Sequence, residues 1–182
     1  MNELQLGKTT KDKIIDYITY FFIYSFLGWI IETIYAFFIH GYFVKRGFLY
    51  GPICPIYGFG AAILIMCTQK LYKKPFQKFL ISTIAFTVFE YLVSLILEVV
   101  FNLRWWDYSN DFLNIQGRVS LLYSIFWGLI GVFLLEKLHP FVQNLIQKLK
   151  SKSKHNIQLI CCLVFIVIII VDFILSSIRY LM

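Results

Sequence analysis

The chain has 182 residues, of which 59% are hydrophobic, 19% aromatic and only 15% charged. A soluble domain needs about 25% charged residues to cover its surface, so this composition argues against a water-soluble enzyme or a nucleic-acid-binding domain. It also excludes a disordered chain, which cannot be this apolar. We interpret the sequence as that of an integral membrane protein. Its net charge of +7 comes mainly from lysines in the loops between the predicted spans, where they indicate membrane topology.

Five apolar windows are the candidate membrane spans. A bilayer core about 30 Å thick requires about 20 mostly apolar residues in each crossing helix. Each span must be helical, because lipid offers the backbone no hydrogen-bond partners. The windows are Ile14–His40, Gly51–Gln69, Phe79–Phe101, Val119–Leu135 and Ile157–Ile178. The predicted fold is therefore an all-α, polytopic membrane protein with five transmembrane helices.

The basic residues are distributed unequally between alternate loops, with twelve on one side and five on the other. Cytoplasmic loops carry the excess of Lys and Arg. We therefore expect a multi-pass protein of the cell membrane with a cytoplasmic N-terminus and an outer C-terminus. The predicted segments are a cytoplasmic tail (1–13), a four-helix core (14–135) with outer loops at 41–51 and 102–118, a basic amphipathic cytoplasmic linker (136–156) and the fifth helix (157–182).

The first outer segment, Phe43–Gly60, reads FVKRGFLYGPICPIYGFG. Its density of glycine and proline indicates turns and broken helix. Pro52 and Pro55 are expected at the start of the second span, where a missing N–H costs least. Unpaired N–H groups at a helix start suit an anion. The segment therefore either connects two helices and does nothing more, or it lines a ligand site.

The second outer segment, Asn102–Val119, is longer than a helix pair requires. It carries the aromatic residues Trp105, Trp106 and Tyr108. Aromatic rings of this kind are favoured at headgroup depth. One interpretation is an aromatic belt with a surface pair between Asp107 and Arg104. The other is a cap over a cavity, to which Asp107, Arg104 and Arg118 contribute charge.

Three glutamates lie within the predicted spans, namely Glu32, Glu90 and Glu98. An ionisable group at bilayer depth costs at least about 2.5 kcal/mol, so such residues usually face the bundle interior and pair. Arg46 is the natural counter-ion for Glu32 or Glu98. Its competitors are Arg104 and Arg118. The glutamates either converge on a polar cavity that opens outward or form buried ion pairs that fix helix register. No catalytic, cofactor or metal constellation is predicted from the sequence.

Five motifs resemble a known family. They are GWIIE (Gly28–Glu32), RGFLYGPICPIYGFGA (Arg46–Ala61), FEYLVSLILE (Phe89–Glu98), WWDYSNDFLNIQGRVSL (Trp105–Leu121) and SIFWG (Ser124–Gly128). Together they resemble the ABC-transporter type IV family of bacterial membrane proteins, also called the CmpB-like family. The resemblance runs from roughly Tyr20 to Pro140, with the fifth helix outside it.

The resemblance implies a small polytopic protein, nominally a permease, and it singles out residues of the two outer segments and of the spans. Combined with the intramembrane charges, it gives one predicted substrate-binding set. This set is Glu32, Arg46, Tyr50, Tyr57, Glu90, Glu98, Trp106, Asp107, Tyr108 and Arg118. A single outward-facing site is the expectation that follows.

Three functions compete at this point. The first is a transporter component, which would need a separate ATPase because the sequence has no nucleotide-binding motif. The second is an accessory or assembly subunit, and the third is an intramembrane enzyme acting on a lipid or lipid-linked substrate. The expected partners are membrane lipids, an ATPase or permease subunit, or a second copy of the chain. No nucleic acid is expected.

Overall fold

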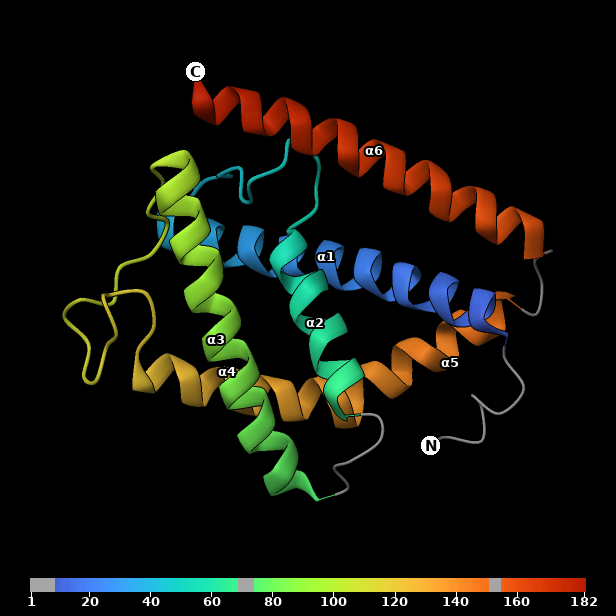
Figure 1. Cartoon of the computed structure of the whole chain (residues 1–182), viewed down its shortest axis with the longest axis horizontal. Coiled ribbons are helices and arrows are strands. Elements are labelled where there is room, and N and C mark those ends of the chain that lie inside the picture. Colours follow the sequence, from blue (N-terminus) through green and yellow to red (C-terminus); the bar gives the residue numbers. More distant parts are fainter. Residues whose placement is uncertain (1–8, 69–73, 151–154) are drawn as a thin grey trace. The chain divides into compact units, whose positions relative to one another are not determined.

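The structure is a computed structural model that describes residues 9–68, 74–150 and 155–182 (Figure 1). These residues form helices and connecting segments, and the described ranges contain no strand beyond an isolated bridge between Ile115 and Val119. The helices are α1 (Thr10–His40), α2 (Pro55–Thr68), α3 (Pro75–Phe101), α4 (Leu121–Phe133), the π-helical turn η2 (Leu134–Leu138), α5 (His139–Lys150) and α6 (His155–Leu181). The all-α prediction is confirmed.

Four helical stretches are long and apolar enough to cross a membrane. They are Thr10–His40, Pro75–Phe101, Leu121–Leu149 and Ile157–Leu181. Helix α2 has 14 residues, which at 1.5 Å per residue gives about 21 Å and falls short of a full crossing. It begins at Pro55 instead of Gly51, because the preceding residues form the bends that the glycines and prolines predicted.

The ends of α1 and α3 have clear chemical causes. Thr9 and Asp12 form a capping box at the start of α1, and Gly41 ends that helix in the left-handed conformation with φ at +76°. Asn102 ends α3 in the same conformation with φ at +53°. Both residue types tolerate positive φ. After these two residues the chain continues into the irregular segments that precede α2 and α4.

The chain divides into two compact units. Unit 1 comprises residues 1–62 and 143–182, and unit 2 comprises residues 63–142. In unit 1, α1 and α6 lie side by side and run in the same direction (Figure 1). Helix α2 approaches α1 where a side chain on Gly58 would overlap Ser25 and Phe21. The small residue permits this close approach, as is common between helices in membranes.

Unit 2 is built on the packing of α3 against α4. Gly128 of α4 faces Thr83 and Phe79, and Gly131 faces Ser82, each so closely that an added Cβ would overlap these neighbours. The absence of side chains at these two glycines therefore allows α4 to approach α3 closely. Lys78 near the start of α3 pairs with Glu136 of η2 at 3.2 Å. These contacts hold α3 and α4 together along much of their length.

The fourth helix does not end near Leu135. It passes through the π-helical turn η2 directly into α5, which ends at Lys150. Much of the predicted amphipathic linker (136–156) is thus helical, since it contains α5. Residues 151–154 of that linker lie outside the described ranges.

Candidate functional site

The first polar cluster, in unit 1, centres on the Glu32 carboxylate of α1. Arg46 donates to Glu32 Oε2 from Nη2 at 2.9 Å and from Nε at 3.3 Å, and the Tyr57 hydroxyl donates to Oε1 at 2.5 Å. The Glu32 side chain is 26% exposed and that of Arg46 is 38% exposed. A cation and a hydroxyl together satisfy both oxygens of this carboxylate. The sequence left Glu32 and Glu98 open as partners of Arg46, and the structure pairs Arg46 with Glu32.

Local geometry explains why Tyr57 reaches Glu32. Gly28 lies one turn before Glu32 on α1, and a Cβ at Gly28 would overlap the Tyr57 ring. The absence of a side chain at this position leaves room for the ring between α1 and α2. The motif GWIIE thus combines a site for the tyrosine ring with the carboxylate that accepts its hydroxyl hydrogen bond.

A second set of contacts in unit 1 was missed from the sequence. The Asp172 carboxylate of α6 accepts hydrogen bonds from the backbone N–H groups of Tyr50 and Gly51 and from the Ser176 hydroxyl. Arg179 donates to the Phe48 carbonyl at 2.7 Å and lies over the Tyr50 ring. The anion expected beside these N–H groups is therefore supplied by the chain itself. The spacing of 172, 176 and 179, a polar stripe on one helix face, could have indicated this.

The second polar cluster, in unit 2, lies along one face of α3. Glu90, Ser94 and Glu98 follow one another at helical spacing, and Glu90 and Ser94 are 6% and 5% exposed. The Tyr108 hydroxyl donates to Glu90 Oε1 at 3.2 Å, and Trp127 of α4 also interacts with this carboxylate. The Tyr108 ring stacks on Tyr123 with ring centroids 4.3 Å apart.

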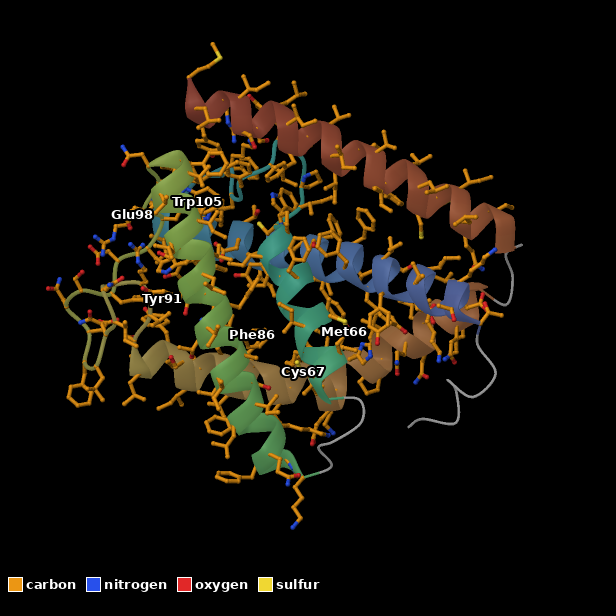
Figure 2. All side chains as sticks on the ribbon, viewed as in Figure 1. Met66, Cys67, Phe86, Tyr91, Glu98 and Trp105 are labelled. Atoms are coloured by element: carbon orange, nitrogen blue, oxygen red, sulfur yellow. The ribbon has the colours of Figure 1, made fainter. Side chains whose placement is uncertain are left out.

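Arg118 pairs with the acid at the C-terminal end of the same face of α3. Its Nη1 contacts Glu98 Oε2 at 2.5 Å and Ser94 Oγ at 3.4 Å, and its side chain is only 11% exposed. The Tyr91 hydroxyl donates to Gln116 Oε1 at 2.8 Å. In Figure 2, Tyr91 and Glu98 both lie along α3, and Glu98 is near the end from which the outer segment departs. The 102–120 segment therefore folds back over the polar face of α3, and we call it the cap.

The cap has its own internal structure. The Trp106 indole donates to the Arg118 carbonyl at 2.8 Å, and the Tyr108 N–H donates to the Gly117 carbonyl at 2.8 Å. Gly117 has φ at +66°, and a Cβ there would overlap Arg104 and Ser109. Glycine is therefore required at this turn.

Asp107 organises the exposed edge of the cap. Its Oδ1 accepts from the Ser109 hydroxyl, the Ser109 N–H and Arg104 Nη2. The Ser109 donors, followed by the charge of Arg104, hold the pKa of Asp107 below its ordinary value. The surface pair of Arg104 and Asp107 that the sequence suggested is present. These hydrogen bonds of Asp107 all lie within the cap, and none of them involves a carboxylate of α3.

The predicted residues thus fall into two groups. Glu32, Arg46, Tyr50 and Tyr57 belong to unit 1. The members in unit 2 are Glu90, Glu98, Trp106, Asp107, Tyr108 and Arg118. The contacts within each group are those given above, and a single outward-facing site that joins the groups stays a prediction. Among the described residues, no set of three or more His, Cys, Asp or Glu side chains could hold a metal ion.

Comparisons with known proteins give one match. The model of a family described as "Putative ABC-transporter type IV" matches residues 19–177. Neither the curated proteins nor the solved structures include a match to the chain. The family match extends through most of α6. The match therefore includes most of the fifth helix, which the motif resemblance left outside.

Proposed function

Because the chain belongs to the ABC-transporter type IV family, we propose that it is a membrane-embedded, permease-type component of a transporter. Four of its helical stretches are long and apolar enough to span a membrane, which supports a position in the bilayer. The observation that supports a transport role is the buried polar face of α3, which the cap covers. A spanning helix that serves only as an anchor has no need of such a face.

The chemistry of this face suits a substrate or ion path. Glu90, Ser94 and Glu98 place two carboxyls and a hydroxyl on one side of a spanning helix. Ionisable residues inside spans characteristically mark substrate and ion pathways. The cap is held by polar contacts, chiefly Arg118 with Glu98 and Tyr108 with Glu90. Polar contacts can be exchanged for water or substrate groups, so the cap can act as a gate.

The proposed orientation places the cap on the outer side of the membrane. The lysines of the N-terminal tail and of the loops before α3 and after α4 would then face the cytoplasm. If α2 counts as a short fifth crossing, the first and the last spanning helices run in the same direction across the membrane, as α1 and α6 do in unit 1. The path along α3 would accordingly open outward.

The energy source we propose is a separate ATPase, since the sequence carries no nucleotide-binding motif. It would dock on the cytoplasmic face, where α5 presents the exposed residues Lys148 and Asn144. Few spans are available in one chain for a complete pathway, so a second copy or a partner permease would complete it.

The experiment is purification of the tagged chain from its native membrane in mild detergent, followed by mass spectrometry of the proteins that accompany it. A nucleotide-binding ATPase in a fixed ratio to the chain is the expected result. A tagged, unrelated membrane protein of similar size purified in parallel defines the background. Recovery of the chain with no ATPase above that background would contradict the ATP-driven role.

A second candidate function is an accessory subunit. It is favoured by the observation that Glu32 and Glu98 are neutralised within the chain by Arg46 and Arg118, which suits a structural role for these pairs. An accessory subunit would co-purify with a complete transporter that has its own permease subunits. The same mass spectrometry distinguishes this result from a complex of the chain with an ATPase alone.

A further inference from the structure

Glu90 differs from the other two glutamates that the sequence placed within the spans. Glu32 and Glu98 each pair with an arginine. The salt bridges of the described residues include none to Glu90, although its residue is only 6% exposed. The neighbours that interact with its carboxyl group, Tyr108 through a hydrogen bond and Trp127, carry no charge. Within the part of the chain that the structure describes, Glu90 is thus a buried acid with no cation in a salt bridge to it.

Two buried oxygen atoms on this stretch of α3 have unused hydrogen-bonding capacity. Glu90 Oε2 and Thr87 Oγ1 are both inaccessible to solvent and have no hydrogen-bond partner in the described part of the chain. They lie three residues apart, which places them on one face of the helix. Buried polar atoms of native proteins are nearly always satisfied, so two unsatisfied oxygens together point to something that binds there.

The charge balance indicates what binds. An ionised carboxylate buried without a cation is strongly disfavoured, and such groups neutralise by taking up a proton. The charged and titratable groups that face Glu90 within unit 2 are Tyr108 of the cap and, one to two turns along α3, the Arg118–Glu98 pair. Arg118 is already engaged by Glu98 and Ser94. None of these groups supplies a free positive charge.

We propose that Glu90 is a proton-binding site within the membrane span. The carboxyl group carries a proton while the cap covers it, with Tyr108 donating to Oε1. It releases the proton when the cap withdraws and water reaches the polar face of α3. This deepens the proposed function by naming an ion that the transport cycle would exchange. The site itself, however, requires no ATPase.

The test is labelling by dicyclohexylcarbodiimide, which reacts with protonated carboxyl groups in apolar surroundings. The purified wild-type chain in detergent is treated over a pH series from about 5.5 to 9, on either side of the range in which buried acids titrate. Modified residues are located by mass spectrometry. We expect modification of Glu90 that decreases as the pH rises. Glu32 and Glu98, each in a salt bridge with an arginine, should react at least about tenfold less.

Three variants serve as controls for this reaction. Glu90→Gln should remove the labelled peptide. Arg118→Met should make Glu98 reactive, which shows that the reagent reaches this face of α3. Tyr108→Phe, which keeps the ring stacked on Tyr123 and removes the hydroxyl donor, should raise the labelled fraction of Glu90 at neutral pH. Elution of each variant at the wild-type position in gel filtration confirms that it is folded.

Two results would overturn the proposal. One is an unlabelled Glu90 in a sample of the Arg118→Met variant whose Glu98 is labelled. The other is labelling of Glu90 that does not change across the pH series. Neither result depends on whether an ATPase co-purifies, so a failure of this inference and a failure of the proposed function can be told apart.

Discussion

The Asp172 carboxylate of α6 accepts the backbone N–H of Gly51 at 2.8 Å, across 121 residues of sequence. The Tyr50 N–H reaches the same carboxylate at 2.7 Å, and the Ser176 hydroxyl at 2.9 Å. Hydrogen bonds to a charged acceptor are the strong ones. They fix the irregular segment before α2 to the last helix, most of which lies within the family match.

We predict that Asp172→Asn lowers the stability of unit 1. An amide offers one oxygen where the carboxylate offers two, and its NH₂ group would face a backbone donor. The expected loss is about 1–3 kcal/mol of unfolding free energy. Unfolding in mixed detergent micelles measures it, with Ile174→Leu, an exposed position of the same helix, as the control. Equal stability of the Asp172→Asn and control variants would show that the carboxylate does not hold the segment.

A second prediction concerns Arg118 and Glu98. Arg118→Met should cost about 2 kcal/mol, less than a fully buried pair because the Glu98 side chain is 37% exposed. The double variant with Glu98→Gln should recover part of this loss, which gives a coupling energy of about 0.5–3 kcal/mol in a double-mutant cycle. Additive losses would mean that the pair is not energetically coupled.

The exposed pair of Arg104 and Asp107 is the matched control for that cycle. Its side chains are 40% and 52% exposed. The coupling between them should be clearly smaller than that between Arg118 and Glu98, because solvent screens exposed charges. A coupling as large as that between Arg118 and Glu98 would remove the distinction between a buried anchor of the cap and a surface contact.

The third prediction addresses the packing of α3 on α4. Gly131→Ala adds a Cβ that overlaps the Ser82 side chain, and overpacking of this kind costs about 1–3 kcal/mol. Adding Ser82→Gly removes the overlapping atoms and should restore part of the loss. The single Ser82→Gly variant gives the cost of glycine in the helix, about 1 kcal/mol. A double variant less stable than either single variant would contradict this contact.

The sequence predicted the helices well, because long apolar stretches have few alternatives in lipid. It misplaced their ends where local chemistry decides, as at Pro55, where the segment Gly51–Cys54 bends before α2 starts. Nothing in the composition near Leu135 marked the π-helical turn through which α4 continues into α5.

The charged partners were predictable in kind and only partly in identity. From the sequence, any of the three arginines named there could pair with a carboxylate. The structure shows that Arg118 of the cap pairs with Glu98 and that Arg46 pairs with Glu32. The role of Asp172 is hard to predict from the sequence, because a lone acid near a helix end has an ordinary explanation at the membrane interface. Its partners are backbone N–H groups, and backbone groups leave no trace in a residue pattern.

The capped polar face of α3 is tested most directly by the reactivity of a thiol at position 94. Ser94 is buried and lies between Glu90 and Glu98. Ser94→Cys is made in a chain whose Cys54, Cys67, Cys161 and Cys162 are replaced, and an impermeant thiol reagent is added to either side of the membrane. We predict that Ser94→Cys reacts slowly with reagent added from the outside, and at least about tenfold faster once Glu98→Gln loosens the cap. Ser82→Cys in the same background should not react. Equal rates with and without Glu98→Gln, or reaction from the cytoplasmic side alone, would contradict a capped face that opens outward.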